Sequence, residues 1–300
     1  MKTILITGAD GQLGKDCCCV LGTGGFIKAV DIDQADIASE KEVTELVSAV
    51  KPDVIVNCAA FTQVDACEEN VERAWDANAR GPANLAKAAA GIGARLIHIS
   101  TDYVFDGTKK PPEAYTEYDS PRPVSVYGKS KLAGETRIME ITDNCVILRT
   151  AWLYGAGGKN FLRTIAAKIA KEPGKRLKIV ADQHGAPTWS YRLALQIQRL
   201  LPPDAKGIYH ASAEGSCTWY ELACLLCRQL ELACSIESCT TAEYPTPARR
   251  PQNSILENHR LKAENLNVMV PWQQDVEAFL AAHGRELTAP PEKRKEGGSL

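Results

Sequence analysis

Short apolar segments alternate with longer amphipathic segments along the first half of the chain. The apolar segments are rich in Val, Ile and Leu, which is typical of strands buried on both faces of a parallel sheet. We predict strands at residues 3–7, 26–31, 53–57, 95–100 and 145–149. We predict helices at residues 12–21, 39–50, 70–90 and 125–140. This alternation predicts an α/β fold with a doubly wound, Rossmann-like parallel sheet, which binds ligands at the carboxyl ends of its strands.

The pattern is less regular after Thr150. There we predict helices at 159–171, 191–200, 219–232 and 272–283, strands at 178–181 and 208–211, and an extended, proline-rich loop at 243–250. Residues 1–150 are therefore expected to form a dinucleotide-binding domain, and residues 151–287 mainly a smaller C-terminal substrate-binding lobe. Some of the later helices are expected to pack back onto the first domain. Residues 288–300 lack apolar periodicity and are predicted to be a disordered tail.

Composition narrows the class of protein without naming an activity. The chain has 300 residues, of which 45% are hydrophobic and 24% charged, and its formal net charge is −2. These values are typical of a globular protein and give no reason to expect a nucleic acid or a membrane surface as partner. No apolar run is long enough to cross a bilayer, and the start does not resemble a signal peptide. We therefore predict a cytoplasmic location.

The eleven cysteines are expected to be reduced thiols, several of them buried. Cys17, Cys18 and Cys19 are consecutive on a predicted helix, where they point in different directions and cannot chelate one ion together. Cys224 and Cys227 have the spacing of metal or redox sites, but no second ligand pair follows them. We predict that both clusters belong to the structural core and that the chain has no metal site.

A glycine-rich turn lies between the first strand and the first helix. Gly8, Gly11 and Gly14 have the spacing G-x-x-G-x-x-G, one residue longer than the usual dinucleotide fingerprint. Glycine permits a tight turn and lets backbone N–H groups approach a pyrophosphate at the helix N-terminus. The position favours dinucleotide binding; the alternative is a glycine-rich connection without a ligand.

Two acids and a segment of small residues extend this prediction. Asp31 ends the second strand, where a carboxylate accepts hydrogen bonds from an adenosine ribose, and Asp36-Ile37 lies at the same edge. An acid there repels a 2′-phosphate, so NADH is slightly favoured over NADPH. The alternative for Asp31 is a helix cap or turn acid. Ala59 and Ala60 follow the third strand, where small side chains let a cofactor lie close.

Tyr127 and Lys131 are four residues apart on a predicted helix and therefore share one face. An ammonium beside a phenol should lower the phenol pKa from its ordinary value of about 10. Such a tyrosine can transfer a proton at neutral pH, and the nucleotide-binding turn suggests that a hydride accompanies it. Thr101 ends the fourth strand and directs a hydroxyl towards the same crevice; a strand-end cap is the alternative for this residue alone.

Several segments carry a family resemblance: GADGQLG, NCAAFTQVDACE, STDYVFDG, YGKSKLAGE, RTAWLYG, DQHGAPT and YPTPARRPQNSIL. Over residues 1 to about 283 the chain resembles the dTDP-4-dehydrorhamnose reductase family, within the extended short-chain dehydrogenase/reductase superfamily. The resemblance implies reduction of the C4 ketone of a dTDP-linked 4-keto-6-deoxy sugar by NADH or NADPH. The substrate would be dTDP-4-dehydro-L-rhamnose and the product dTDP-L-rhamnose, for surface polysaccharide.

The resemblance also implies roles for individual residues. Tyr127 would be the proton donor, Lys131 would bind the nicotinamide ribose, and Thr101 would hydrogen-bond the reacting oxygen. Contacts to the cofactor would come from Gly11, Gln12, Leu13, Asp36, Ile37, Ala60, Phe61 and Thr62, and contacts to the sugar nucleotide from Thr101, Asp102 and Trp152. The chain departs from the expected pattern at Cys58 and Phe61, and its segment between Thr101 and Tyr127 is slightly long.

Other positions have weaker assignments. Arg249 and Arg250 are candidates for pairing with the substrate diphosphate, since guanidinium groups suit phosphate oxygens, with plain surface charge as the alternative. His184 is interpreted as a loop histidine. Asn78 either supports the site by a hydrogen bond or contributes only to packing. Some relatives hold magnesium at an acidic dimer contact; Asp16 marks that position, but one acid does not support a metal. A homodimer is a family-level expectation.

Three alternatives stay open. The first is a reductase, or an epimerase/reductase, acting on a different nucleotide-linked 4-ketosugar. The second is a non-catalytic NAD(P)-binding regulatory subunit, like the relatives that bind methionine adenosyltransferase, and the third is a sensor of cofactor occupancy. The intact set of Thr101, Tyr127 and Lys131 argues against a role limited to binding.

Overall fold

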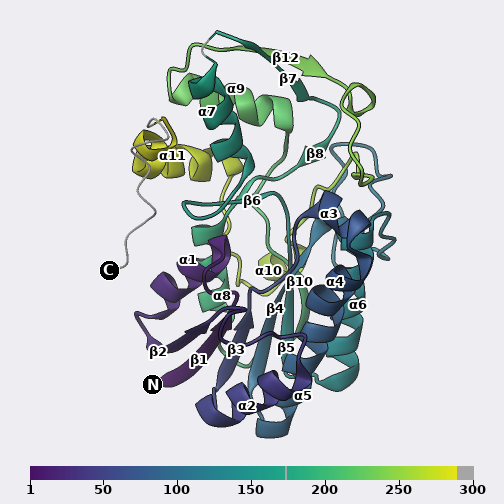
Figure 1. Ribbon diagram of the computed structural model, residues 1–300, viewed down its shortest axis with the longest axis vertical. Helices are drawn as coiled ribbons and strands as arrows, with labels where there is room; N and C mark the ends of the chain where they lie inside the picture. Colours follow the sequence, from purple (N-terminus) through teal and green to yellow (C-terminus); the bar gives the residue numbers. More distant parts are fainter. Residues whose placement is uncertain (173, 289–300) are drawn as a thin grey trace.

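A six-stranded, all-parallel sheet forms the centre of the larger domain (Figure 1). The computed structural model describes residues 1–172 and 174–288. The strand order is β10-β5-β4-β3-β1-β2. The strands are β1 (Lys2–Thr7), β2 (Gly25–Val30), β3 (Val54–Asn57), β4 (Arg95–Thr101), β5 (Cys145–Thr150) and β10 (Gly207–His210). The predicted doubly wound α/β fold is confirmed.

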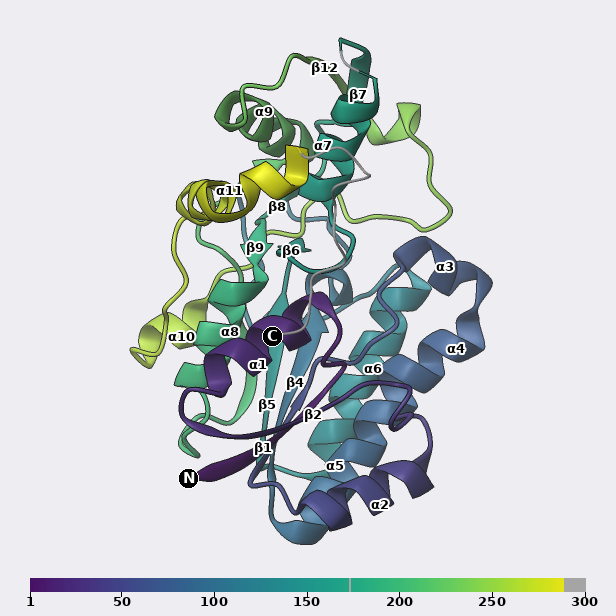
Figure 2. The same ribbon diagram turned by 60° about the vertical axis from the view of Figure 1, so that its left-hand side comes forward.

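The alternation of side chains along β1 divides the core into two layers. Ile4 and Ile6 belong to a cluster with α1 (Gln12–Leu21) and α8 (Ser190–Arg199) on one face of the sheet. Leu5 points to the other face, which is covered by three helices. These are α2 (Glu40–Val50), α5 (Gly81–Ile92) and α6 (Val126–Ile141), and Figure 2 shows the two groups of helices on opposite sides. Both sheet faces are therefore apolar, as the continuous Val/Ile/Leu segments predict.

The predicted helix at 70–90 is interrupted. The structure has α4 (Val71–Trp75), one π-helical segment (Asp76–Arg80) and then α5, with a short helix α3 (Val64–Glu69) before them. Pro82, which has no backbone N–H, occupies the first turn of α5, where none is required. The wider π turn directs Asn78 into the interior, where its side chain is fully buried.

The second lobe has its own hydrophobic core. Its helices are α7 (Phe161–Lys171), α9 (Trp219–Gln229) and α11 (Trp272–Thr288). Three two-stranded sheets join β6 (Leu153–Tyr154) with β9 (Thr188–Trp189), β7 (Arg176–Val180) with β12 (Ser235–Cys239), and β8 (His184–Gly185) with β11 (Cys217–Thr218). In both views this lobe lies beyond the carboxyl ends of the large sheet (Figures 1 and 2).

The chain after Thr150 contributes to both domains. Strand β10 pairs with β5 in the large sheet, α8 packs on α1, and α10 (His259–Ala263) contacts β10. Thr288, assigned above to the tail, ends α11, and residues 289–300 lie outside the described residues. Within the described part of the chain, every helix is too short or too polar to cross a membrane.

Candidate functional site

The glycine turn connects β1 with α1 at the carboxyl end of β1. The strand order of the sheet reverses at this point, between β1 and β3. Gly8 has φ +68°, and a Cβ at this position would lie 2.6 Å from the backbone nitrogen of Ala59. A side chain larger than hydrogen is therefore excluded there by both conformation and space. Gly11 precedes the first turn of α1 and has no side chain to cap it. The first N–H groups of α1 are thus available to an anion.

A groove with a volume of about 440 Å³ begins at this turn. Eight of the residues predicted to contact the cofactor line this groove: Gly8, Gly11, Asp31, Asp36, Ile37, Ala59, Ala60 and Phe61. Gly14 packs against Gly8 and Ala9, and the side chain of Leu13 lies in the core, so Leu13 offers only backbone atoms. Thr62 is exposed and does not line the groove.

Asp31 holds the glycine turn as well as lining the groove. Its Oδ2 accepts a hydrogen bond from the Asp10 backbone N–H at 2.8 Å, and its Oδ1 accepts one from the Ile32 N–H, also at 2.8 Å. Each carboxylate oxygen can accept a second bond, so this arrangement is compatible with a ribose hydroxyl. Both interpretations of Asp31 from the sequence, turn acid and ribose acceptor, therefore fit one geometry.

Asn78 connects the groove at Phe61 with the helix that carries Tyr127. Its Oδ1 accepts from the Phe61 N–H at 2.9 Å, and its Nδ2 donates to the Phe61 carbonyl at 3.0 Å and to Ser130 Oγ at 3.1 Å. Ser130 Oγ in turn donates to the Tyr127 carbonyl at 2.9 Å. The amide therefore fixes the position of Phe61 relative to the first turn of α6, and its role is support by hydrogen bonds.

The three predicted catalytic side chains are buried at the carboxyl end of the sheet. Thr101 is the last residue of β4, and Tyr127 and Lys131 lie one turn apart at the start of α6. The Ser125 hydroxyl caps this helix by accepting from the Gly128 N–H at 3.1 Å. The Thr101 hydroxyl donates to Asp102 Oδ1 at 2.9 Å and lies close enough to the Tyr127 phenol to affect its pKa. The structure therefore brings the proposed donor and its partner together.

The electrostatics of Tyr127 differ from the sequence prediction. Burial raises the pKa of the Tyr127 phenol well above its ordinary value, and the hydrogen bond with Thr101 only partly opposes this. The expectation that Lys131 lowers this pKa is wrong in this structure: desolvation of the phenolate is the largest effect, and Lys131 is not among the groups that shift the pKa. The phenol is therefore protonated at neutral pH, which is the form that a proton donor needs.

Of the predicted substrate contacts, Asp102 directly follows Thr101, and Trp152 comes two residues after Thr150, which pairs with Thr101 in the sheet. Burial raises the pKa of Asp102 to about 6, against the effect of the Ser254 and Thr101 hydroxyls. Trp152 has the unusual φ of +46° and stacks on Trp219, with ring centroids 3.5 Å apart. Gly185 leaves the room for its indole, since a Cβ there would overlap the ring. Such strain in a non-glycine residue is typical of functional sites.

Arg249 and Arg250 have different surroundings. Arg250 Nη2 forms an ion pair with Asp65 Oδ2 at 2.7 Å, and its Nη1 donates to the Tyr103 hydroxyl at 3.2 Å. Arg249 is exposed. Arg250 therefore joins the proline-rich loop to α3, and Arg249 is the better candidate for pairing with a diphosphate.

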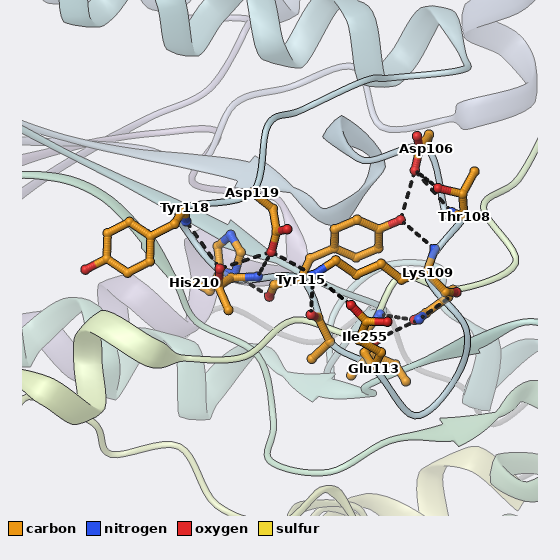
Figure 3. A network of polar contacts seen from close by, with 12 residues as sticks. Asp106, Thr108, Lys109, Glu113, Tyr115, Tyr118, Asp119, His210 and Ile255 are labelled. Atoms are coloured by element: carbon orange, nitrogen blue, oxygen red, sulfur yellow. Dashed lines mark hydrogen bonds and ion pairs between the residues drawn. The ribbon is translucent and has the colours of Figure 1, made fainter.

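The long segment between Thr101 and Tyr127 is held by a polar network around Tyr115 (Figure 3). The Tyr115 hydroxyl donates to Asp106 Oδ1 at 2.9 Å, and its backbone exchanges 2.8 Å hydrogen bonds with Ile255 and Glu257. Lys109 Nζ lies 2.9 Å from Asp119 Oδ2. The second-lobe segment that follows Arg250 thus fixes the loop that leads from Thr101 to α6.

Other predictions have mixed outcomes. Cys17 is buried in the core and Cys18 packs against it, but Cys19 is exposed, so the first cluster is only partly structural core. Cys227 packs in the second core, with its Sγ 2.7 Å from that of Cys234. Asp16 Oδ2 accepts from Ser190 Oγ at 2.5 Å. Among residues 1–172 and 174–288, no group of three or more His, Cys, Asp or Glu side chains could hold a metal ion.

Sequence reasoning missed three residues of the site: His98, Arg73 and Trp219. His98 is buried beneath Lys131, Arg73 stacks over the Phe61 ring at 4.7 Å and lines the groove, and Trp219 supports Trp152. The sequence could have indicated His98, because a histidine at the centre of an apolar strand requires a polar partner. Arg73 and Trp219 lie on helices outside the quoted motifs, so no local pattern marks them.

Comparisons with known proteins agree with this geometry. The family model described as the RmlD substrate binding domain matches residues 1–284. A dTDP-4-dehydrorhamnose reductase from Burkholderia thailandensis is 39% identical over 291 residues, covering 91% of this chain and 96% of its own length.

Solved structures show the same relationship. The crystal structure of the dTDP-4-dehydrorhamnose reductase from Clostridium acetobutylicum has a TM-score of 0.90 and 38% identity, covering 94% of this chain and 99% of its own. The Bacillus anthracis dTDP-4-dehydrorhamnose reductase in complex with NADP has a TM-score of 0.90 and 36% identity, with the same coverage. The chain therefore belongs to the dTDP-4-dehydrorhamnose reductase family.

Proposed function

We propose that the chain reduces the C4 ketone of dTDP-4-dehydro-L-rhamnose to dTDP-L-rhamnose with NADPH or NADH. The observation that carries the proposal is the buried pair of Thr101 and Tyr127 at the end of β4 and the start of α6, beside the groove that begins at Gly8. A hydroxyl pair of this kind suits a carbonyl whose oxygen gains charge as it is reduced.

The groove fits a nicotinamide dinucleotide. Gly8 and Ala59 approach so closely that only backbone and small side chains line its start, and the first turn of α1 offers N–H groups to a pyrophosphate. NADPH as cofactor is supported by the complex of the Bacillus anthracis relative with NADP. Arg73 lines the groove and is the nearby cation available to a 2′-phosphate, which weakens the expectation from Asp31 that NADH is favoured.

The residues divide the reaction between them. Bound NADPH or NADH supplies the hydride for the sugar C4. Tyr127 donates its phenolic proton to the carbonyl oxygen, and Thr101 hydrogen-bonds the same oxygen as negative charge develops there. Lys131 binds the nicotinamide ribose, Asp102 and Trp152 contact the sugar, and Arg249 pairs with the diphosphate.

The test is consumption of reduced nicotinamide by the purified full-length protein with enzymatically generated dTDP-4-dehydrorhamnose. The expected result is turnover and a product that chromatographs as dTDP-L-rhamnose, with slower turnover of UDP- and GDP-linked ketosugars. Turnover of those sugars alone would move the assignment to another nucleotide-sugar reductase. Dinucleotide binding without turnover of any ketosugar would favour the regulatory-subunit alternative. A cytoplasmic location and a homodimer remain predictions, which cell fractionation and sedimentation of the purified protein check.

A further inference from the structure

A chain of buried hydrogen bonds lies behind the proposed site and ends at Lys131. Asn57 Oδ1 accepts from Thr7 Oγ1 at 2.8 Å and from the Ala59 N–H at 3.0 Å. Asn57 Nδ2 lies 3.0 Å from His98 Nδ1, and His98 Nε2 lies 3.3 Å from Lys131 Nζ. Asn57 and His98 are both at most 1% exposed, so water does not compete for these groups.

The orientation of the Asn57 side-chain amide is fixed by its neighbours. A backbone N–H can only donate, so the Ala59 amide requires the oxygen of Asn57 to face it. The Asn57 NH₂ group then faces His98 and must donate to Nδ1. Turning the amide over would set its NH₂ group against the Ala59 N–H, leaving two donors 3.0 Å apart.

The orientation of the Asn57 amide determines which ring nitrogen of His98 carries the proton. Burial and the neighbouring Lys131 hold the pKa of His98 well below its ordinary value, so the ring is neutral. A neutral imidazole whose Nδ1 accepts must carry its proton on Nε2. The Nε2–H group therefore points at Lys131 Nζ, which can accept a hydrogen bond only as a neutral amine. The Ile99 carbonyl, 2.6 Å from Nζ, receives one of the amine hydrogens.

We infer that His98 is a positioning residue for Lys131, holding Nζ in place and favouring its neutral amine through a hydrogen bond from Nε2–H. The other titratable groups acting on Lys131 are Cys58, at the end of β3, and Glu135, on its own helix; both favour the ammonium. The Glu135 charge is engaged by Arg149, whose Nη2 lies 2.6 Å from Glu135 Oε2. Burial outweighs both and lowers the pKa of Lys131 to about 8. Lys131 is therefore mainly an ammonium below about pH 8 and becomes, above that pH, the neutral amine that can accept from Nε2–H.

The first test uses the unmodified protein. Long-range ¹H–¹⁵N correlation spectra of the full-length chain report which ring nitrogen of each histidine carries a proton. We expect the His98 signal, assigned by its loss in His98→Asn, to show a protonated Nε2 and a bare Nδ1 above about pH 8, where Lys131 is the neutral amine. An Nδ1–H tautomer or an imidazolium at His98 in the unmodified protein would overturn the inference, since the variant serves only for assignment.

The second test follows the Lys131 side chain by ¹³C labelling at Cε, with Lys131→Arg to assign the signal. His98→Asn keeps an amide near the Nδ1 position but removes the donor to Nζ, whereas His98→Gln keeps a donor near Nε2. We expect titration near pH 8 in the unmodified protein, roughly one pH unit higher in His98→Asn, and nearly unchanged in His98→Gln. The same titration in all three proteins would contradict a role for His98.

The kinetic consequence rests on the proposed function. The alkaline limb of the kcat profile with dTDP-4-dehydrorhamnose should move in His98→Asn by the same amount as the Lys131 titration, and His98→Gln should restore it. A residue that merely packs would lower kcat equally at all pH values. The NMR titrations need no substrate, so they separate the two proposals. An inactive protein that shows the predicted Lys131 titrations refutes the reductase proposal. An active protein that does not show them refutes only the role of His98.

Discussion

The guanidinium of Arg250 forms an ion pair with the carboxylate of Asp65, their nearest atoms being 2.7 Å apart. The pair joins the proline-rich loop that follows β12 to α3, which follows the groove-lining segment at Phe61. Arg250 also donates to the Tyr103 hydroxyl, and the Tyr103 ring lies edge-on to Tyr127 at 5.5 Å. This contact therefore connects the two parts of the chain that flank the proposed proton donor.

Asp65→Asn should loosen that connection and weaken substrate binding. Both partners are partly exposed, so the pair contributes about 0.2–1 kcal/mol, and we expect a rise in the KM for the sugar nucleotide of up to about fivefold. Steady-state kinetics measure it. Glu237→Gln, which removes a more exposed ion pair between β7 and β12, is the matched control and should leave KM unchanged. Equal KM values in both variants would show that the Asp65 contact does not bear on binding.

Tyr127→Phe should abolish most of the activity while leaving the cofactor groove intact. Loss of a positioned proton donor lowers kcat by roughly 10²- to 10⁴-fold. NADPH affinity, measured by fluorescence titration, should stay within a few fold, because the hydroxyl and not the ring is removed. Near-normal turnover in this variant would remove Tyr127 from the role of proton donor.

Asp102→Asn should make the fold more stable near neutral pH. The pKa of Asp102 is raised by burial to about 6, so the folded protein binds this proton more tightly than the unfolded chain does. Ionisation therefore destabilises the fold progressively as the pH rises from near 4 to above 6.

The asparagine variant lacks this charge and should gain about 1–3 kcal/mol relative to the unmodified protein at high pH. Urea unfolding of both proteins near pH 4 and near pH 8 measures the difference. A gain that is the same at both ends of the range would mean that Asp102 does not titrate as described.

Gly8→Ala should disrupt the turn that begins the groove. The added Cβ would meet the Ala59 nitrogen at 2.6 Å in a backbone conformation with φ +68°, so we expect a loss of about 1–3 kcal/mol and weaker NADPH binding. Gly91→Ala is the control: a Cβ there meets nothing within 4 Å, and helix α5 should gain about 0.5–1 kcal/mol. Thermal unfolding and dinucleotide titration distinguish the two variants. Unchanged stability and affinity in Gly8→Ala would contradict this account of the turn.

The local pattern of the chain was enough to predict the strands of the large sheet, the glycine turn and the pairing of Tyr127 with Lys131 on one helix. These features depend on neighbours a few residues away, through side-chain alternation, helical spacing and the conformational freedom of glycine. The family could be predicted from short motifs for the same reason, because each motif is one continuous segment that can be identified without knowing the fold.

The charge states and the partners of the site depended on the tertiary structure. Whether the Tyr127 pKa rises or falls depends on how completely other segments exclude water from it, and periodicity does not report that. The contact of His98 with Lys131 spans 33 residues, and that of Arg250 with Asp65 spans 185. Desolvation and ion pairing act through space, so they are determined only when the folded chain brings distant residues together.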